Sequence, residues 1–260
     1  MKKKLIILGC GNSTGVPRID NYWGKCDSKN KKNARTRCSA LILKGSNSIL
    51  IDTSPDIKNQ LIANKIQNIS SVIYTHEHAD QTNGLFELRP FFWKNGKRIN
   101  IYGDLKTVNL LKKRFNFCFK KGGDYPPIVK ANIIKKSFSL GQSNEKVYFY
   151  ALKVKHGSIN SLAYIFEKTA YISDCNDLSI SKMDELKNLK YLIIDCLKIK
   201  KNYAHFNLKE SLHVHKYLKP KKTILTNLHY DLDYDYLLKK LPYNVIPAYD
   251  GLKLNLWKKS

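Results

Sequence analysis

A cluster of histidine and acidic residues stands directly after a short apolar run, and this feature constrains the fold most. The run Val72-Ile73-Tyr74-Thr75 has the length and composition of a buried strand, and His76-Glu77-His78-Ala79-Asp80 follows without a break. Imidazole and carboxylate groups are ligands of Zn, Mn and Fe, and residues i and i+2 that straddle a tight turn can face one ion. A catalytic metal site needs about three protein ligands and an open position. The pattern therefore predicts a metal site at a strand end, with His156 and Asp174 as the further candidates.

The other apolar runs predict a mixture of strands and helices. In the first half, a strand leads into the glycine-rich loop 9–17, and Gly45-Ser46-Asn47 is typical of a hairpin turn. In the second half, strands and helices alternate. The expected strands are 4–8, 39–43, 48–52, 72–75, 99–102, 147–154, 162–166, 170–173, 191–195, 223–225 and 245–247, and the expected helices begin at 54–56 and occupy 105–115, 208–218 and 234–241. This order predicts an α/β sandwich in a single domain over residues 1–260.

The chain is strongly basic. It has 46 Lys and Arg against 21 Asp and Glu, a formal net charge of +25, and a hydrophobic fraction of 43% that is ordinary for a packed protein. Such an excess can indicate a nucleic-acid or phosphate partner. However, only six of the 46 are Arg, and the lysines are spread along the whole chain, as codon bias toward A/T-rich triplets would also produce. A nucleic-acid partner therefore stays open and is not favoured.

The cysteines and the apolar runs indicate in which cellular compartment the protein is expected. Six cysteines are scattered without C-x-x-C spacing, which favours a reducing cytoplasm. No apolar stretch approaches the ~20 residues that span a bilayer, and the run 5–8 after the basic start is too short for a signal peptide. We expect a cytoplasmic protein with no membrane partner.

Several motifs occur in one order along nearly the whole chain and carry a resemblance to a known family. They are Leu8-Gly9-Cys10-Gly11, Asp52-Thr53-Ser54-Pro55-Asp56, Thr75-His76-Glu77-His78-Ala79-Asp80, His156-Gly157, Ser173-Asp174, Ala204-His205-Phe206 and Ala248-Tyr249-Asp250-Gly251. Together they resemble the metallo-β-lactamase superfamily, in its PhnP-like phosphodiesterase branch. The resemblance implies a four-layer αβ/βα sandwich in which two mixed β-sheets are flanked by helices.

The resemblance also implies a ligand set. His76, His78 and His156 match the ligands of a first metal ion, Asp174 matches a carboxylate that bridges two ions, and Asp80 matches a catalytic ligand of the second ion. In this family a metal-bound hydroxide attacks phosphorus. His205 matches the catalytic histidine that protonates the leaving oxygen, and its side chain titrates near neutrality. The implied cofactors are one or two divalent ions, Mn or Zn.

The chain departs from the family pattern at the second ion and in the loop after the first strand. Gln81 and Asn227 stand where the family has histidines, and they offer only weak carbonyl ligands. His229 reaches the site only if its loop curls inward, and a purely structural role is equally compatible. Cys26 and Cys38 are expected to be buried thiols, and Tyr230 replaces the histidine of a zinc site in the PhnP loop, so no structural zinc is expected.

Substrate contacts are expected from the loops. Ser13, in the glycine-rich loop, is a weak candidate for an anion contact, and turn formation explains the glycines equally well. Arg18, Arg35 and Arg37 fall in the next loop, and Arg89 follows the metal motif. These arginines are the charges most expected to meet a substrate.

The resemblance implies a metal-dependent hydrolase of small cyclic phosphates, such as a cyclic ribose phosphate or a 2′,3′-cyclic nucleotide. Two alternatives stay open. One is a nuclease resembling ribonuclease Z, although no long inserted arm that would grip tRNA is evident. The other is a degenerate, non-catalytic protein that binds nucleic acid or a phosphometabolite. A homodimer is compatible with the sequence.

Overall fold

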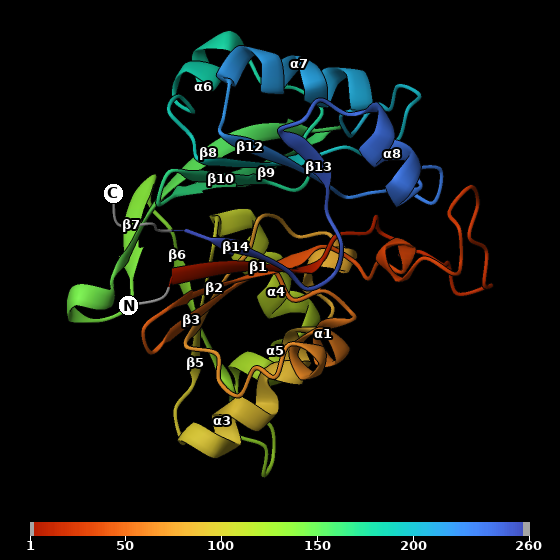
Figure 1. Cartoon of the computed structure of the whole chain (residues 1–260). Helices are drawn as coiled ribbons and strands as arrows, with labels where there is room; N and C mark the ends of the chain where they lie inside the picture. The colour runs from red at the N-terminus through yellow and green to blue at the C-terminus, as the bar shows by residue number, and fades with distance from the viewer. Residues whose placement is uncertain (1–2, 257–260) are drawn as a thin grey trace.

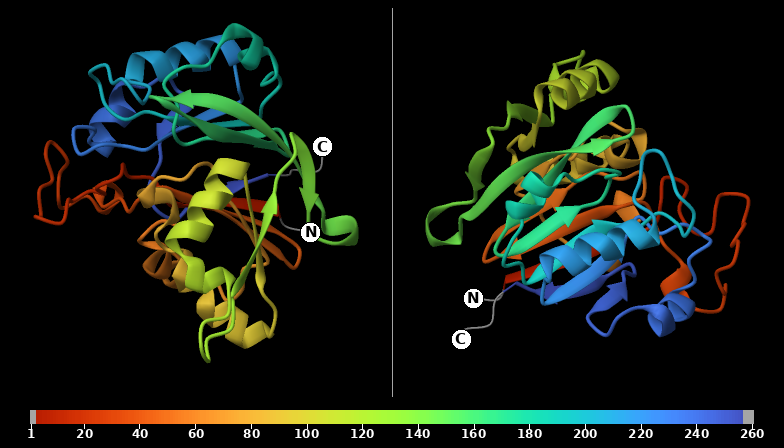
Figure 2. Two further views of the ribbon diagram at one scale, coloured as in Figure 1. Left: turned by 180° about the vertical axis from the view of Figure 1, so that it is seen from behind. Right: turned by 90° about the horizontal axis from the view of Figure 1, so that it is seen from above.

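Two mixed β-sheets face each other, and helices cover the outer face of each sheet (Figure 1). The computed structural model describes residues 3–256. The view from behind shows the same succession of helices, sheet, sheet and helices (Figure 2, left). This arrangement confirms the four-layer α/β sandwich expected from the sequence.

The first sheet contains seven strands in the order β14-β1-β2-β3-β4-β5-β6. Pairing is antiparallel from β14 to β3 and parallel from β3 to β6. The predicted hairpin joins β2 to β3, and Gly45 adopts the left-handed φ of 60° that its turn requires. The strands are β1 (Lys3–Gly9), β2 (Ser39–Lys44), β3 (Asn47–Ile51), β4 (Ser71–Ile73), β5 (Ile99–Gly103), β6 (Val129–Ile133) and β14 (Leu252–Asn255).

The second sheet follows the same plan. Its order is β13-β12-β11-β10-β9-β8-β7, with parallel pairing from β13 to β10 and antiparallel pairing from β10 to β7. The strands are β7 (Ser137–Leu140), β8 (Val147–His156), β9 (Ile159–Phe166), β10 (Thr169–Ile172), β11 (Tyr191–Asp195), β12 (Lys222–Thr226) and β13 (Val245–Pro247).

The helices form the two outer layers. Helices on the first sheet cover a cluster of buried side chains that includes Leu61, Leu85 and Leu111, and those on the second cover one that includes Val214 and Leu237. A third cluster lies between the sheets and draws side chains from both. The α-helices are α1 (Ile57–Ala63), α2 (Ala79–Thr82), α3 (Arg89–Asn95), α4 (Leu105–Arg114), α5 (Asn116–Phe119), α6 (Ile180–Asp184), α7 (Leu208–Leu218) and α8 (Tyr234–Lys240), and the 3₁₀ helices are Lys31–Asn33, Leu85–Leu88 and Ser143–Glu145. No helix among residues 3–256 is long and apolar enough to cross a membrane.

The sequence predicted the buried strands and missed elements with a weaker apolar signal. β6 and β7 lie at sheet edges, and their polar, half-exposed residues give no clear alternation. The sequence also failed to predict β14 and the short helices α2, α3, α5 and α6. In α1, Ile57 and Leu61 are buried, whereas Ile62 is 66% exposed.

The two sheets bring several strand ends to one place. Within the first sheet β1, β3 and β4 run in the same direction, and within the second β8, β10, β11 and β12 do so. Each of these strands is followed by a loop that carries a residue singled out by the sequence. Clefts beyond the carboxyl ends of strands are the usual binding sites of α/β sheets.

Candidate metal centre

Three imidazole rings meet at this edge of the two sheets. His76 and His78 lie in the loop after β4, and His156 is the last residue of β8. One ring nitrogen from each lies within 4.8 Å of the others, and His78 Nδ1 is 3.1 Å from His156 Nε2. Two nitrogen ligands of a tetrahedral zinc ion stand about 3.3 Å apart, so the spacing fits one divalent ion. The structure thus brings together the three ligands that the sequence predicted.

Hydrogen bonds from neighbouring groups determine which ring nitrogen of His76 and of His156 faces the centre. The Thr75 hydroxyl donates to Asp52 Oδ2 (2.9 Å), so its oxygen accepts from Nδ1 of His76 (3.0 Å). His156 donates its Nδ1–H to the Ala204 carbonyl (2.7 Å). Both rings therefore keep a lone pair on Nε2, and His76 Nε2 is buried with no hydrogen-bond partner among the described residues. Such hydrogen bonds are the usual way in which proteins orient metal-binding histidines.

The pKa of His76 agrees with a ligand role. Burial lowers this pKa, Asp174 opposes the shift and the imidazoles of His156 and His78 add to it, and the net pKa is about 3. The ring is therefore neutral at physiological pH, which is the form that binds a metal ion.

Asp174 adds a carboxylate to the imidazoles. It follows β10, is 2% exposed, and forms a second close group with His156 and His205. Burial alone would raise its pKa, but His76, His156 and His205 hold that pKa below its ordinary value. Asp80, in the first turn of α2, lies nearby, and burial together with Asp174 raises its pKa to about 6.

His205 is held by a carboxylate that the sequence analysis did not identify. Its Nδ1 lies 2.7 Å from Oδ2 of Asp195, the fully buried last residue of β11. Burial would lower the pKa of His205, but Asp195, Asp174 and Asp80 raise it to about 9. Burial raises the pKa of Asp195 to about 7, and His205 opposes that rise. A strand-end aspartate beside Asp174 and Asn227 on neighbouring parallel strands was the signal that could have revealed it.

The three weak ligand candidates are placed differently. Gln81 Nε2 and Asn227 Nδ2 both donate toward Asp174, at 3.4 and 3.3 Å. His229 belongs to neither close group of potential ligands among the described residues. Its ring packs against Tyr230 (3.5 Å between centroids), and its Nδ1 lies 3.2 Å from Asp231.

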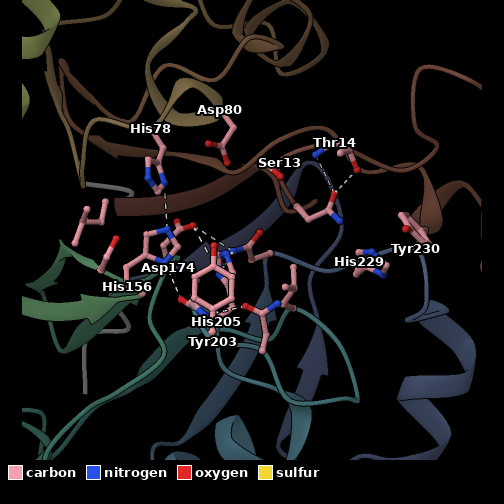
Figure 3. Close-up of a pocket in the computed structure, with 18 of the residues that line it drawn as sticks. Ser13, Thr14, His78, Asp80, His156, Asp174, Tyr203, His205, His229 and Tyr230 are labelled. Carbon is pink, nitrogen blue, oxygen red and sulfur yellow. Dashed lines mark hydrogen bonds and ion pairs between the residues drawn. The ribbon is translucent and has the colours of Figure 1, made fainter.

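The centre opens into a cavity of about 540 Å³. In Figure 3, His78, His156, Asp174 and His205 gather on one side, whereas His229 and Tyr230 lie on the other, beyond Ser13 and Thr14. Arg18 also lines the cavity and lies over the rings of Tyr22 and Tyr230, at 5.0 and 5.8 Å. Ser13 and Arg18 therefore reach the cavity, as the sequence predicted. Asn12, Asn202 and Tyr203 line it too and were not predicted.

The other three arginines lie elsewhere, which corrects the expectation that they face the substrate. Arg35 is 2% exposed, and its guanidinium donates to Leu232 O (2.7 Å), Asn33 Oδ1 (3.0 Å) and His229 O (3.3 Å). Arg37 pairs with Asp56 at 2.8 Å. Arg89 lies over the rings of Phe86 and Trp93. Partners within the fold hold all three side chains.

Cys26 and Cys38 are buried thiols, as expected. Cys26 lies 3.8 Å from Arg35 Nη1, and Cys38 contacts the Gly11 carbonyl and Thr226. Within residues 3–256, no cysteine joins a group of three or more potential metal ligands. The loop that carries Cys26 is instead tied to the segment before α8 by Arg35 and Asn33.

The matches to known proteins agree with this geometry. A family model described as a beta-lactamase superfamily domain matches residues 47–230, more than half of the chain. The chain belongs to the metallo-β-lactamase superfamily. The matched residues contain the three histidines of the centre together with Asp174 and His205.

Two solved structures show how closely this superfamily member follows its relatives. A diphosphatase from the PhnP family superposes with a TM-score of 0.87 and 30% identity, over 98% of this chain and 97% of that chain. Zn²⁺-bound PqqB from Methylobacterium extorquens superposes with a TM-score of 0.80 and 16% identity, over 97% and 99%, which shows the fold alone. The chain is thus a PhnP-like member of the superfamily, and its donor set fits a divalent ion such as Zn²⁺.

One curated relative is named octanoyltransferase, from Porphyromonas gingivalis (strain ATCC BAA-308 / W83). It is 28% identical over 256 residues, which make up 96% of this chain and 51% of that protein. The chain therefore spans about half the length of the curated relative that it matches.

Proposed function

We propose that this metallohydrolase cleaves a phosphodiester bond in a small cyclic phosphate, such as a cyclic ribose phosphate or a 2′,3′-cyclic nucleotide. One observation carries the proposal: the three-histidine centre and the His205–Asp195 pair open into the same cavity. A divalent ion in such a centre supplies Lewis-acid charge for phosphate oxygens and lowers the pKa of water. His76, His78 and His156 would hold that ion together with Asp174.

His205 supplies the proton in this proposal. Its Nδ1 is engaged by Asp195 at 2.7 Å, which leaves Nε2 as the nitrogen that can serve a leaving oxygen. Because the acidic neighbours raise its pKa to about 9, the ring keeps its proton at neutral pH. An alkoxide leaving group needs such an acid, whereas a nitrophenolate leaves without one.

The cavity supports a small substrate. A volume of about 540 Å³ lies within the range of small-molecule sites. Ser13 and Thr14 give one wall hydroxyl groups that suit an anion, and Arg18 lines the same wall with its guanidinium paired to Asp20. A long nucleic acid would need a basic surface continuous with the cavity, and Arg35, Arg37 and Arg89 do not line it.

A second candidate reaction is hydrolysis of a phosphoanhydride. The observation that favours it is the 30% identity to a diphosphatase of the PhnP family over nearly the whole of both chains. An anhydride leaving group is a phosphate and needs less help from an acid than a sugar hydroxyl. The dependence on His205 therefore separates the two reactions.

The test is a substrate panel with protein reconstituted with Zn²⁺ or Mn²⁺. The panel holds a 2′,3′-cyclic nucleotide, bis(4-nitrophenyl) phosphate, a dinucleoside diphosphate and 4-nitrophenyl acetate. We expect hydrolysis of the first two, with His205→Ala lowering turnover of the cyclic nucleotide by about 10²-fold or more and that of the aryl diester far less. His213→Ala, on the exposed face of α7, is the matched control and should change neither. Hydrolysis of the carboxylic ester alone would contradict the proposal.

A further inference from the structure

Four side chains occupy the part of the centre where the family resemblance places a second metal ion. Asp80 and Asp174 contribute carboxylates, and Gln81 and Asn227 contribute amides where the resemblance implies imidazoles. An imidazole offers a nitrogen lone pair to a metal, whereas an amide nitrogen offers none. Only the amide oxygen could bind an ion, and it is a poor ligand for zinc.

The two amides turn their N–H groups toward the carboxylates. Gln81 Nε2 donates to Asp80 Oδ2 at 3.2 Å and to Asp174 Oδ2 at 3.4 Å. Asn227 Nδ2 donates to the Ser173 carbonyl at 3.1 Å and to Asp174 Oδ1 at 3.3 Å, and it also lies 3.1 Å from His205 Nδ1, which is engaged with Asp195. The opposite orientation would press a carbonyl oxygen against these oxygens. Both oxygens of Asp174 thus receive an amide N–H.

Gln81 Oε1 has no hydrogen-bond partner among the described residues. In the orientation that the structure has, the amide nitrogen and not this oxygen lies against the two carboxylates. The amide arrangement therefore gives the carboxylates hydrogen-bond donors in the place of a cation.

The remaining donors provide for one ion. Residues 3–256 contain two close groups of potential ligands, His76–His78–His156 and His156–Asp174–His205, and both need His156. Nδ1 of His156 is committed to the Ala204 carbonyl at 2.7 Å, so its ring has one lone pair left, on Nε2. One lone pair binds one ion. His205 is further committed through Nδ1 to Asp195.

We propose that this centre holds a single divalent ion, and that the amide N–H groups of Gln81 and Asn227 take the place of the second. The inference rests on the metal centre of the proposed function and is independent of its substrate. The side opposite the ion then presents N–H groups and the His205 ring to a phosphate, in the place of a second ion.

The backbone allows a direct test by restoring imidazoles. Asn227 has a left-handed φ of 61°, a conformation that Asn and His both tolerate better than most residues. Gln81 lies in α2 and is fully buried against the carboxylates. The double variant Gln81→His with Asn227→His therefore adds two lone pairs without a new backbone demand.

The experiment is native mass spectrometry with elemental analysis, after chelation, reconstitution with excess Zn²⁺ and desalting. We expect one zinc per wild-type chain and two per chain in the double histidine variant. Gln81→Leu with Asn227→Gly is the matched control, which removes the amides without adding ligands and should still hold one. Asp80→Asn, a milder change, should also hold one.

The outcomes separate this inference from the proposed function. Two zinc ions in the wild type, with one lost in Asp80→Asn, would overturn the single-ion centre and leave the hydrolase proposal intact. A folded double histidine variant that still holds one zinc would overturn the role given to the amides. A wild type that holds none would overturn both proposals.

Discussion

Arg35 is predicted to be a structural clamp, and Arg35→Met measures its contribution. The guanidinium donates to Leu232 O, Asn33 Oδ1 and His229 O. Asn33 Oδ1 also accepts from the Tyr234 amide, and His229 O accepts from the Leu232 amide, so both keep a partner when the guanidinium is removed. Only the buried Leu232 carbonyl is left without a described partner.

The loss of stability in Arg35→Met can be estimated from the hydrogen bonds that these three acceptors lose. The Leu232 carbonyl, left buried without a hydrogen bond, lowers the stability of the fold by about 1–3 kcal/mol. Asn33 Oδ1 and His229 O each lose one of two hydrogen bonds, which costs about 0.5–1.5 kcal/mol apiece. Methionine keeps most of the aliphatic packing, and removal of a buried charge returns part of the loss. We therefore expect the free energy of unfolding to fall by about 3 kcal/mol, which is a shift of about 1 M in the urea midpoint at a slope of about 3 kcal/mol/M.

Urea denaturation of the chelated protein, followed by tryptophan fluorescence, is the assay. Arg37→Met is the matched control, because Arg37 forms a partly exposed ion pair with Asp56 and should contribute at most about 1 kcal/mol. KM should be unchanged in both variants, since neither arginine lines the cavity. An Arg35→Met protein that unfolds at the wild-type urea concentration but has a raised KM would refute the clamp.

Three further predictions concern the centre and the loop beside it. Acidic neighbours overcome burial to raise the pKa of His205 to about 9, so the stabilisation given by its protonated form is complete below pH 6.5 and is lost as the pH rises through 9. Asp195→Asn should remove that dependence and lower the NMR titration midpoint of His205 in chelated protein by at least about 2 units; an unchanged midpoint would contradict the pairing. The Asp174→Ala variant should lose its metal ion on desalting and should not turn over substrate. A variant that retains the metal would contradict the assignment of Asp174 as a ligand. Gly24 has φ 59°, and an added Cβ would stand 2.5 Å from the Tyr230 ring. Gly24→Ala should therefore loosen the loop 25–37, which is rich in lysine, and speed its cleavage by trypsin. Cleavage at the wild-type rate would argue against this contact.

The strands and the first metal ligands could be predicted because their signals are local. The apolar run 72–75 and the polar cluster after it identify both a buried strand and its end, and the structure places His76 and His78 there. His156 was a candidate by its residue type alone, and only the resemblance made it the third ligand, because nothing in its own segment distinguishes the end of a long strand from a surface histidine.

The remainder depends on pairings between distant segments. Asp195 belongs to no motif, and only the parallel pairing of β11 with β10 and β12 brings it to His205. Arg35 looked like a substrate contact because arginines in polar loops are usually exposed, whereas this loop folds back on the segment before α8 and buries the guanidinium. The strands β6 and β7 lie at sheet edges, where each pairs with one neighbouring strand only, and their half-exposed sequences show little apolar alternation.

The most direct test of the account is recovery of activity during metal titration. Chelated protein is supplied with Zn²⁺ or Mn²⁺ in fractions of an equivalent while hydrolysis of bis(4-nitrophenyl) phosphate is recorded. We expect no hydrolysis by the metal-free protein, a linear rise up to one ion per chain and a plateau beyond it. Hydrolysis that persists in the fully chelated protein, or none at any metal level, would contradict a metal-dependent phosphodiesterase centre built on His76, His78, His156 and Asp174.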